Sequence, residues 1–415
     1  MPRARPSRRR ARGGRSRPIS RPARARSKRR CRRPTARGRD ERSLPRRRLA
    51  ARARSVLMLR ARRDAAPMPD RYVLVLAGGR GERFWPWSRP ERPKQFLPLA
   101  SDGRSLLAST MTRAGAIAPP ARCLVLTSAD LVARVTAECP PGTRVFGEPV
   151  GRNTGPAIAA AAHWIQRESP GSAFAVLPAD HAIDDRAAFA ADLDRALSLA
   201  ERETVLVTFG VPATRPDTVF GYVRRGARLG DRLFRVASFE EKPTRERAEE
   251  FLADGGYQWN AGIFAWRAEV LLQALAASRP VLAGALRPLV DAPDLQTGLD
   301  RVLPECESVS VDYAVLEHAP NVLVIEAGFD WDDLGSWASW ARRQPRDERG
   351  NVLFGDAVAV ECDDCIVVGD GGVAAALGLR RMVVVHAEGA TLTCPLDRGE
   401  DVRRVSEAAR ARRRS

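Results

Sequence analysis

Three glycines and four cations stand close together early in the chain, in a pattern that could bind a polyphosphate. They follow a short apolar run at residues 72–77 and comprise Gly78, Gly79, Gly81, Arg83, Arg89, Arg92 and Lys94. Because glycine has no Cβ, the backbone N–H groups of such a turn can curl around an anion. The cations behind it would neutralise phosphate charge. A Gly-rich turn after a strand is also common without any ligand, so the turn alone leaves both interpretations open.

The spacing excludes two well-known phosphate loops. No Gly-Lys-Ser/Thr follows, as a Walker motif requires, and the dinucleotide fingerprint needs a third glycine where Arg83, Phe84 and Trp85 stand. What remains is a Gly-Gly-x-Gly-x-Arg loop, followed by Trp-Pro-x-Ser-Arg at 85–89 and Pro-Lys-Gln-Phe at 93–96.

Asp180 is a second candidate, because it directly follows another apolar run. Ligands of α/β sheets gather at the carboxyl ends of the strands. Mg²⁺ takes one or two carboxylates and leaves further ligand positions to substrate phosphates, so Asp180 could hold this ion. An Asp at this point could equally cap the following helix. The neighbouring His181 is interpreted as a packing or hydrogen-bonding residue.

The elements that must position these residues alternate between strand and helix. Apolar runs predict strands at Tyr72–Ala77, Cys123–Thr127, Ala173–Leu177 and Thr204–Val211. Helical patterns lie between them, at Leu106–Ile117, Pro156–Arg167 and Ala187–Glu201. This order predicts an α/β domain over 68–345. Short apolar runs divided by Gly and Asp predict a small β domain over 346–415, with a helix only in its final Arg-rich stretch.

The net charge of +19 comes from the first 67 residues, which hold 27 Lys and Arg against 3 acidic residues. That segment has almost no aliphatic side chains before Leu44, so we expect it to be disordered, or not translated if the chain starts at Met68. A nucleic-acid tether is a further alternative. We expect no DNA binding by a chain that begins at Met68, and nucleic acid is therefore an unlikely partner.

No apolar run approaches the roughly 20 residues that span a bilayer, which predicts a soluble protein without membrane contact. The seven cysteines follow no secretion signal, which indicates reduced thiols in the cytoplasm. Cys362 and Cys365 have the spacing of half a zinc site, but no second pair completes it.

The strings at 78–83, 85–89 and 93–96 closely resemble the signature of the sugar-phosphate nucleotidyltransferases, and within them the mannose-1-phosphate guanylyltransferases. The first string is shared with uridylyl and thymidylyl enzymes, whereas the other two are more typical of the mannose branch. The resemblance extends over roughly Tyr72 to Val405. It implies a Rossmann-like mixed, mostly parallel sheet, a C-terminal β-helix-like or prism-like domain, and a homodimer.

The resemblance also implies a GTP site. Its residues would be Ala77, Gly78, Gly79, Gly81, Glu148, Arg152, Asn153 and Thr154. In this interpretation Arg83 and the glycine amides hold the β and γ phosphates, and Lys94 neutralises charge near the α-phosphate. From the residues alone, the 147–156 segment is a polar turn with Thr154 or Gly155 as helix cap. Gly155 replaces the family's usual Ala, a change expected to matter little.

A sugar-phosphate site is implied by three later strings, which could otherwise be turns at a sheet edge. The residues carried over are Gly221, Tyr222, Glu241, Lys242, Asn260 and Gly262. A Trp-x-Asp-x-Gly-x-Trp string at 331–337 implies Asp333 as the second Mg²⁺ carboxylate, with Asp332 as its nearest competitor for that role. The implied reaction is the attack of mannose 1-phosphate on the α-phosphorus of GTP, for which no general base is needed.

Two further alternatives stay open at this point. Another sugar-1-phosphate nucleotidyltransferase, using UTP or dTTP and a different hexose phosphate, would share the Gly-rich loop. A catalytically silent regulatory subunit would lack one of the four key residues, but Arg83, Lys94, Asp180 and Asp333 are all present.

Overall fold

The computed structural model describes residues 70–79 and 81–414, all within the unit Pro67–Ser415. The Arg-rich segment 1–67 lies outside the described residues, so its expected disorder stays a prediction. Among the described residues, no helix is both long and apolar enough to cross a membrane.

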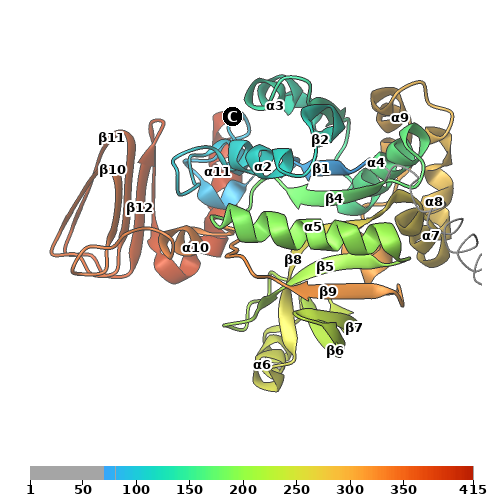
Figure 1. Ribbon diagram of the computed structural model, residues 1–415. Helices are drawn as coiled ribbons and strands as arrows, with labels where there is room; N and C mark the ends of the chain where they lie inside the picture. Colours follow the sequence, from blue (N-terminus) through green and yellow to red (C-terminus); the bar gives the residue numbers. More distant parts are fainter. Residues whose placement is uncertain (1–69, 80, 415) are drawn as a thin grey trace, which may run out of the picture. The chain divides into compact units, whose positions relative to one another are not determined.

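Within this described part, nine strands form one mixed sheet in the order β3-β2-β1-β4-β8-β5-β9-β7-β6 (Figure 1). Their bounds are β1 Tyr72–Leu76, β2 Cys123–Ser128, β3 Arg144–Glu148, β4 Ala173–Pro178, β5 Leu206–Pro212, β6 Tyr222–Gly230, β7 Leu233–Glu240, β8 Tyr257–Arg267 and β9 Val322–Glu326. The first four strands in that order pair in parallel. β8 then runs antiparallel to both β4 and β5. The predicted Rossmann-like mixed sheet is confirmed.

Helices cover both faces of the sheet, because successive side chains of each buried strand point to opposite sides. Leu74 of β1 packs toward α4, α7 and α9, whereas Val73 and Val75 pack toward α2, α3 and α5. These helices span α2 Leu106–Gly115, α3 Val132–Glu138, α4 Thr154–Glu168, α5 Arg186–Arg202, α7 Ala268–Ser278 and α9 Leu295–Val302. Two further helices, α6 Arg245–Asp254 and α8 Pro280–Ala285, complete this domain.

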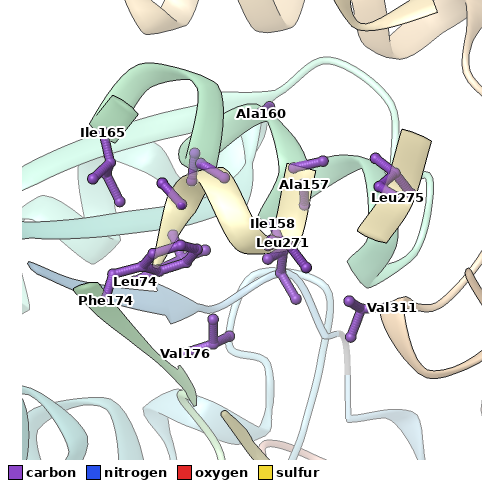
Figure 2. Packing of buried hydrophobic residues seen from close by; sticks show 14 of the residues in the cluster. Leu74, Ala157, Ile158, Ala160, Ile165, Phe174, Val176, Leu271, Leu275 and Val311 are labelled. Carbon is purple, nitrogen blue, oxygen red and sulfur yellow. The ribbon is translucent and has the colours of Figure 1, made fainter. Parts of the chain in front are cut away.

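The α4 side of the core is built from small residues against large ones. Figure 2 shows Ala157 and Ile158 of α4 near Leu271 of α7, with Ala160 higher on the helix and Phe174 of β4 to the left. The alanines let α4 pack closely on the sheet and on α7, and Phe174 is completely buried there. This packing fixes the start of α4 and the end of β4, next to the segments that carry the candidate site.

The C-terminal β domain is a second sheet, in the order β10-β11-β12-β13. Its strands are β10 Val352–Val360, β11 Ile366–Leu377, β12 Met382–Ala387 and β13 Ala390–Pro395, with α10 Trp337–Ala341 before them and α11 Val402–Arg414 after them. The first two pairings are parallel and the last is antiparallel. Short parallel strands stacked in this way confirm the β-helix-like prediction.

Aromatic side chains join this domain to the Gly-rich segment. Trp87 stacks on Trp337 with ring centroids 5.7 Å apart, and Phe84 lies 5.0 Å from the same ring. Trp87 also meets Phe354 of β10 at 5.1 Å. All of these rings except Phe354 are fully buried, so the segment after the glycines is anchored in apolar packing between the two sheets.

The predicted elements are found within a few residues of their expected bounds, with two kinds of correction. Helix α4 begins at Thr154 with Asn153 as its cap, not Thr154 or Gly155. Strands β3, β6, β7, β8 and β9 were not predicted. The Trp-Asn-Ala-Gly string lies inside β8, between β4 and β5, so the alternative that it forms a sheet-edge turn is wrong.

Candidate active site

A cavity of about 500 Å³ opens at the carboxyl ends of β1, β3 and β4. Twelve of the predicted site residues line it: Gly78, Gly79, Glu148, Asn153, Thr154, Asp180, Gly221, Glu241, Lys242, Asn260, Gly262 and Asp333. Six predicted residues do not line it: Ala77, Gly81, Arg83, Lys94, Arg152 and Tyr222. The structure therefore brings together seven separate stretches of the chain around one volume.

The Gly-rich loop leaves β1 and folds back on the segment around Lys94. Gly81 has a φ of 57°, and a Cβ there would come within 2.1 Å of the Lys94 Cβ. Glycine is therefore required at this position both for its backbone conformation and for space. Ala77 is held by its carbonyl oxygen, which accepts from Gln95 Nε2 over 2.8 Å and from Thr127 Oγ1 over 3.0 Å.

Lys94 lies under the cavity and contacts both carboxylate-bearing loops. Its Nζ donates to Asp180 Oδ2 over 2.9 Å and also to the backbone carbonyl of Asp333. The Lys94 side chain is only 6% exposed. Burial opposes ionisation of Asp180, but the charge of Lys94 and its hydrogen bond lower the pKa of that carboxyl group. Burial dominates at Asp333, where it raises the pKa to about 6 despite the charge of Lys94.

The alternative interpretation of Asp180 as a helix cap is wrong. Helix α5 is capped by Asp185, whose Oδ1 accepts from the Ala188 N–H over 2.9 Å. His181 accepts from Trp331 Nε1 over 3.1 Å, and burial lowers its pKa to about 4. It is therefore a neutral hydrogen-bonding residue, as expected.

Glu148 and the start of α4 form another part of the wall. Burial raises the pKa of Glu148 to about 7. Asn153 adopts a φ of 64°, and its Oδ1 accepts from the Thr154 N–H over 2.8 Å. Arg152 is directed elsewhere, because its guanidinium donates to the backbone carbonyls of Leu303 and Pro304.

Gly155 is not interchangeable with alanine in this chain. A Cβ at this position would come within 2.7 Å of the Val309 carbonyl oxygen, which already accepts from the Gly155 N–H over 2.9 Å. The expectation that the change from Ala matters little is therefore contradicted: the backbone at 309 approaches α4 more closely than an alanine would allow.

A third part of the wall combines acids with an amide. Glu241 is nearly buried and pairs with Lys242 at 3.0 Å. Its Oε2 lies over Gly221, where a Cβ would come within 2.4 Å of that oxygen. Asn260 Nδ2 donates to Asp312 Oδ1 over 2.9 Å. Tyr222 is buried behind this wall, and its hydroxyl donates to the Asp217 carbonyl over 2.9 Å.

Arg83 belongs to a 3₁₀ turn, Glu82–Phe84, that the C-terminal residues hold in place. Its guanidinium pairs with Glu400 at 2.7 Å. On the same turn, Glu82 accepts from Arg410 of α11 over 2.6 Å. Arg83 therefore does not line the cavity, and its charge is directed toward a carboxylate of the C-terminal domain.

Among the wall residues that the sequence analysis did not assign to the site are Phe220, Trp331 and Asp312. The two aromatic rings lie 5.3 Å apart. Phe220 directly precedes the predicted Gly221, and Trp331 begins the sequence string that contains Asp333. Asp312 begins a π-helical turn, Asp312–Leu316, far from every string considered. Nothing in its immediate sequence indicates that it contacts the cavity.

The set of oxygen donors fits a hard divalent cation. Asp180 and Asp333 both line the cavity and share Lys94. In the described part of the chain, no group of three or more His, Cys, Asp or Glu side chains is arranged to hold a metal by itself. A cation at this position would therefore take further ligands from phosphate oxygens and water, which is the usual arrangement for Mg²⁺.

Comparisons with known proteins agree with this geometry. A family model described as nucleotidyl transferase matches residues 72–349, and one described as MannoseP isomerase/GMP-like beta-helix domain matches 355–408. A mannose-1-phosphate guanylyltransferase of Klebsiella pneumoniae is 38% identical over 82% of this chain and 74% of its own length. The alginate biosynthesis protein AlgA of Pseudomonas aeruginosa is 37% identical over 82% of this chain and 73% of its own.

A solved structure is similar to this chain in both sequence and fold. It is described as a mannose-1-phosphate geranyltransferase from Thermus thermophilus. It is 35% identical, covers 82% of this chain and 99% of its own, and superposes with a TM-score of 0.75.

Proposed function

This chain belongs to the nucleotidyl transferase family and, within it, to the mannose-1-phosphate guanylyltransferases, and on this basis we propose the reaction that it catalyses. It transfers GMP from GTP to α-D-mannose 1-phosphate, giving GDP-mannose and pyrophosphate. One observation carries the proposal: twelve of the motif residues of that family, scattered from Gly78 to Asp333, line a single cavity of about 500 Å³. This volume suits a nucleotide or a comparable small ligand.

The reaction needs positioning and charge neutralisation more than proton transfer. A phosphate oxygen of mannose 1-phosphate is already anionic, so it can attack the α-phosphorus without a general base. As the new P–O bond forms, the bond to the β-phosphate oxygen breaks and pyrophosphate leaves. We assign Lys94 to the charge that develops near the α-phosphate, because its buried ammonium lies between the two carboxylate loops.

The triphosphate is assigned to the Gly-rich loop. Gly78 and Gly79 are exposed to the cavity, and their backbone can approach a phosphate closely. Arg83 would hold the β or γ phosphate, for which it must exchange the Glu400 carboxylate for a phosphate oxygen. Both partners of that ion pair are substantially exposed, so the exchange costs little.

Mg²⁺ is assigned to the carboxylates of Asp180 and Asp333. When bound, it neutralises phosphate charge and orients the reacting phosphates. Burial raises the pKa of Asp333, and a cation bound beside it would favour the ionised carboxylate.

Guanine and the sugar phosphate are assigned to different walls of the cavity by their hydrogen-bonding groups and charge. Guanine offers N–H donors at N1 and N2, and Glu148, with Asn153 beside it, supplies acceptors. Sugar hydroxyls suit Glu241 and Asn260, while the exposed ammonium of Lys242 suits the sugar's phosphate. Tyr222 and Arg152 support these walls from behind, since neither side chain reaches the cavity.

Pyrophosphate release tests the function directly. GTP, ATP, UTP and dTTP are each supplied with mannose 1-phosphate or glucose 1-phosphate, with Mg²⁺ present throughout. We expect GTP with mannose 1-phosphate to give a kcat/KM at least about tenfold above every other pair, which corresponds to roughly 1.4 kcal/mol of discrimination. Equal or faster release with UTP or dTTP would favour a nucleotidyltransferase of another specificity.

The cysteines and the exposed apolar residues support a proposed cellular location and oligomeric state. The six cysteines in the described part of the chain are free thiols, which supports a cytoplasmic location. The homodimer implied by the family resemblance would find an apolar surface on β10 and β11, where Val358, Val360 and Leu377 are exposed.

A further inference from the structure

Asp312 is a cavity residue to which no role has been assigned so far. It begins the π-helical turn Asp312–Leu316, which is anchored by the buried side chains of Val315 and Leu316. It lines the same cavity as Glu241 and Asn260. A π-helical turn is an uncommon element that often occurs at functional sites.

The carboxylate of Asp312 is held in place by a hydrogen-bonded chain. The Thr208 hydroxyl and the Gly262 N–H both donate to Asn260 Oδ1, over 2.7 and 3.4 Å. With its oxygen occupied by donors, the Asn260 amide must present its nitrogen to Asp312, and Nδ2 donates to Oδ1 over 2.9 Å. Thr208 is fully buried in β5, so the chain is anchored in the central sheet.

Acceptor capacity remains on this carboxylate. A carboxylate has about four acceptor positions, and Asn260 occupies one of them. Glu241 and Asp312 line the same cavity, and burial together with the charge of Glu241 raises the pKa of Asp312. Two adjacent carboxylates would repel a phosphate but can accept from hydroxyl groups, so this part of the wall suits a polyhydroxylated ligand.

We propose that Asp312 accepts a hydrogen bond from a ring hydroxyl of the sugar and, together with Glu241, determines which sugar phosphate the enzyme uses. This inference rests on the proposed function and deepens it. Asn260 then has two roles: it contacts a sugar hydroxyl, and its hydrogen bond to Asp312 orients that carboxylate toward the substrate.

The first test is Asp312→Asn, assayed at pH 8 to favour the ionised carboxylate of the wild type. Asparagine has the same shape and can still accept from Asn260, so the fold should survive. We expect the KM for mannose 1-phosphate to rise at least about tenfold, as for a lost hydrogen bond to a charged group, with the KM for GTP within about twofold of wild type. Asp291→Asn, at an exposed position away from the cavity, is the matched control.

A second variant, Asp312→Ala, removes the partner of Asn260 altogether. It should show the same selective rise in the sugar-phosphate KM, with a thermal unfolding curve recorded to verify folding. If both variants raise the KM values for GTP and for mannose 1-phosphate equally, Asp312 is a structural residue and the proposal fails.

Deoxy analogues identify the contact itself. The wild type and Asp312→Asn are compared on mannose 1-phosphate and on its 2-, 3-, 4- and 6-deoxy forms. We expect one analogue to be used equally well by both proteins, because the hydroxyl and the carboxylate that bind each other are then removed together. If the substitution reduces kcat/KM by the same factor for all five substrates, Asp312 does not contact a hydroxyl. An inactive wild type would instead overturn the proposed function, whereas an active wild type with an unaffected variant overturns only the role of Asp312.

Discussion

The ammonium group of Lys94 links the two acidic loops of the cavity, donating to the Asp180 carboxylate over 2.9 Å and to the backbone carbonyl of Asp333. Lys94 and Asp333 are 239 residues apart in the chain. Lys94 is itself kept in place by the Gly-rich loop, since only a glycine at position 81 leaves room for its Cβ. The loop assigned to the triphosphate and the acids assigned to the metal are therefore parts of one packed unit.

Lys94→Met tests the central cation. Methionine preserves much of the buried aliphatic volume but removes the positive charge, so turnover should fall by at least about two orders of magnitude. Steady-state pyrophosphate release measures the effect, and Arg202→Met, at an exposed position late in α5, serves as control. A loss of less than fivefold would show that Lys94 only supports the fold.

The ion pair between Arg83 and Glu400 predicts opposite effects for its two partners. Arg83→Ala should lose at least about two orders of magnitude in turnover, because it removes a phosphate-binding charge. Glu400→Gln should lower the KM for GTP by about two- to fivefold, the scale of an exposed ion pair, because Arg83 no longer has to leave a carboxylate. If Glu400→Gln instead raises the KM for GTP, Glu400 positions Arg83 and does not compete with the phosphate.

Glu148 predicts a pH dependence of nucleotide binding. Its pKa is raised to about 7, so below that pH the carboxyl group is protonated and accepts poorly from the guanine N–H groups. The KM for GTP should therefore rise about tenfold between pH 8 and pH 6, as expected when binding needs one deprotonated group of that pKa. Glu148→Gln should have a higher KM at pH 8 and lose this additional rise. Parallel pH profiles for the two proteins would exclude Glu148 as the titrating group.

Gly81→Ala tests the requirement for glycine in the loop. The added Cβ would collide with Lys94, and the φ of 57° is unfavourable for alanine, so we expect a loss of about 1–3 kcal/mol in the free energy of unfolding. Gly79→Ala is a close control, because a Cβ added there would meet no other atom within 4 Å. Chemical denaturation of both variants measures the difference. Equal stabilities would mean that the loop can move away from Lys94 at little cost.

The parallel half of the sheet could be predicted because its strands are short, apolar and buried on both faces. Strands β6 and β7 could not, since this hairpin carries exposed charged residues, such as Arg224 and Arg228, and its register shifts repeatedly. Strand β8 could not be predicted either, because it contains the Trp-Asn-Ala-Gly string, whose glycine indicates a turn. Gly262 instead adopts a φ of 65° inside the strand. Local sequence patterns indicate which residues are buried and where turns occur. They do not indicate which strands, distant in the sequence, pair with each other in the sheet.

Most of the candidate site was predictable because each motif carries its own chemistry. The exceptions depend on contacts between distant parts of the chain. The direction of Arg83 is set by Glu400, 317 residues later, and that of Arg152 by backbone carbonyls about 150 residues later. Asp312 reaches the cavity through a turn without a recognisable motif, and only its neighbours Asn260 and Glu241 reveal its position.

The most direct test of the account is the position of the metal with the nucleotide bound. Crystals grown with GTP and Mn²⁺ as a substitute for Mg²⁺ would show the ion by its anomalous scattering. We predict a peak in contact with carboxylate oxygens of both Asp180 and Asp333 and with a phosphate oxygen, while the triphosphate lies against Gly78 and Gly79. A peak that contacts neither acid, or a nucleotide bound outside this cavity, would contradict it.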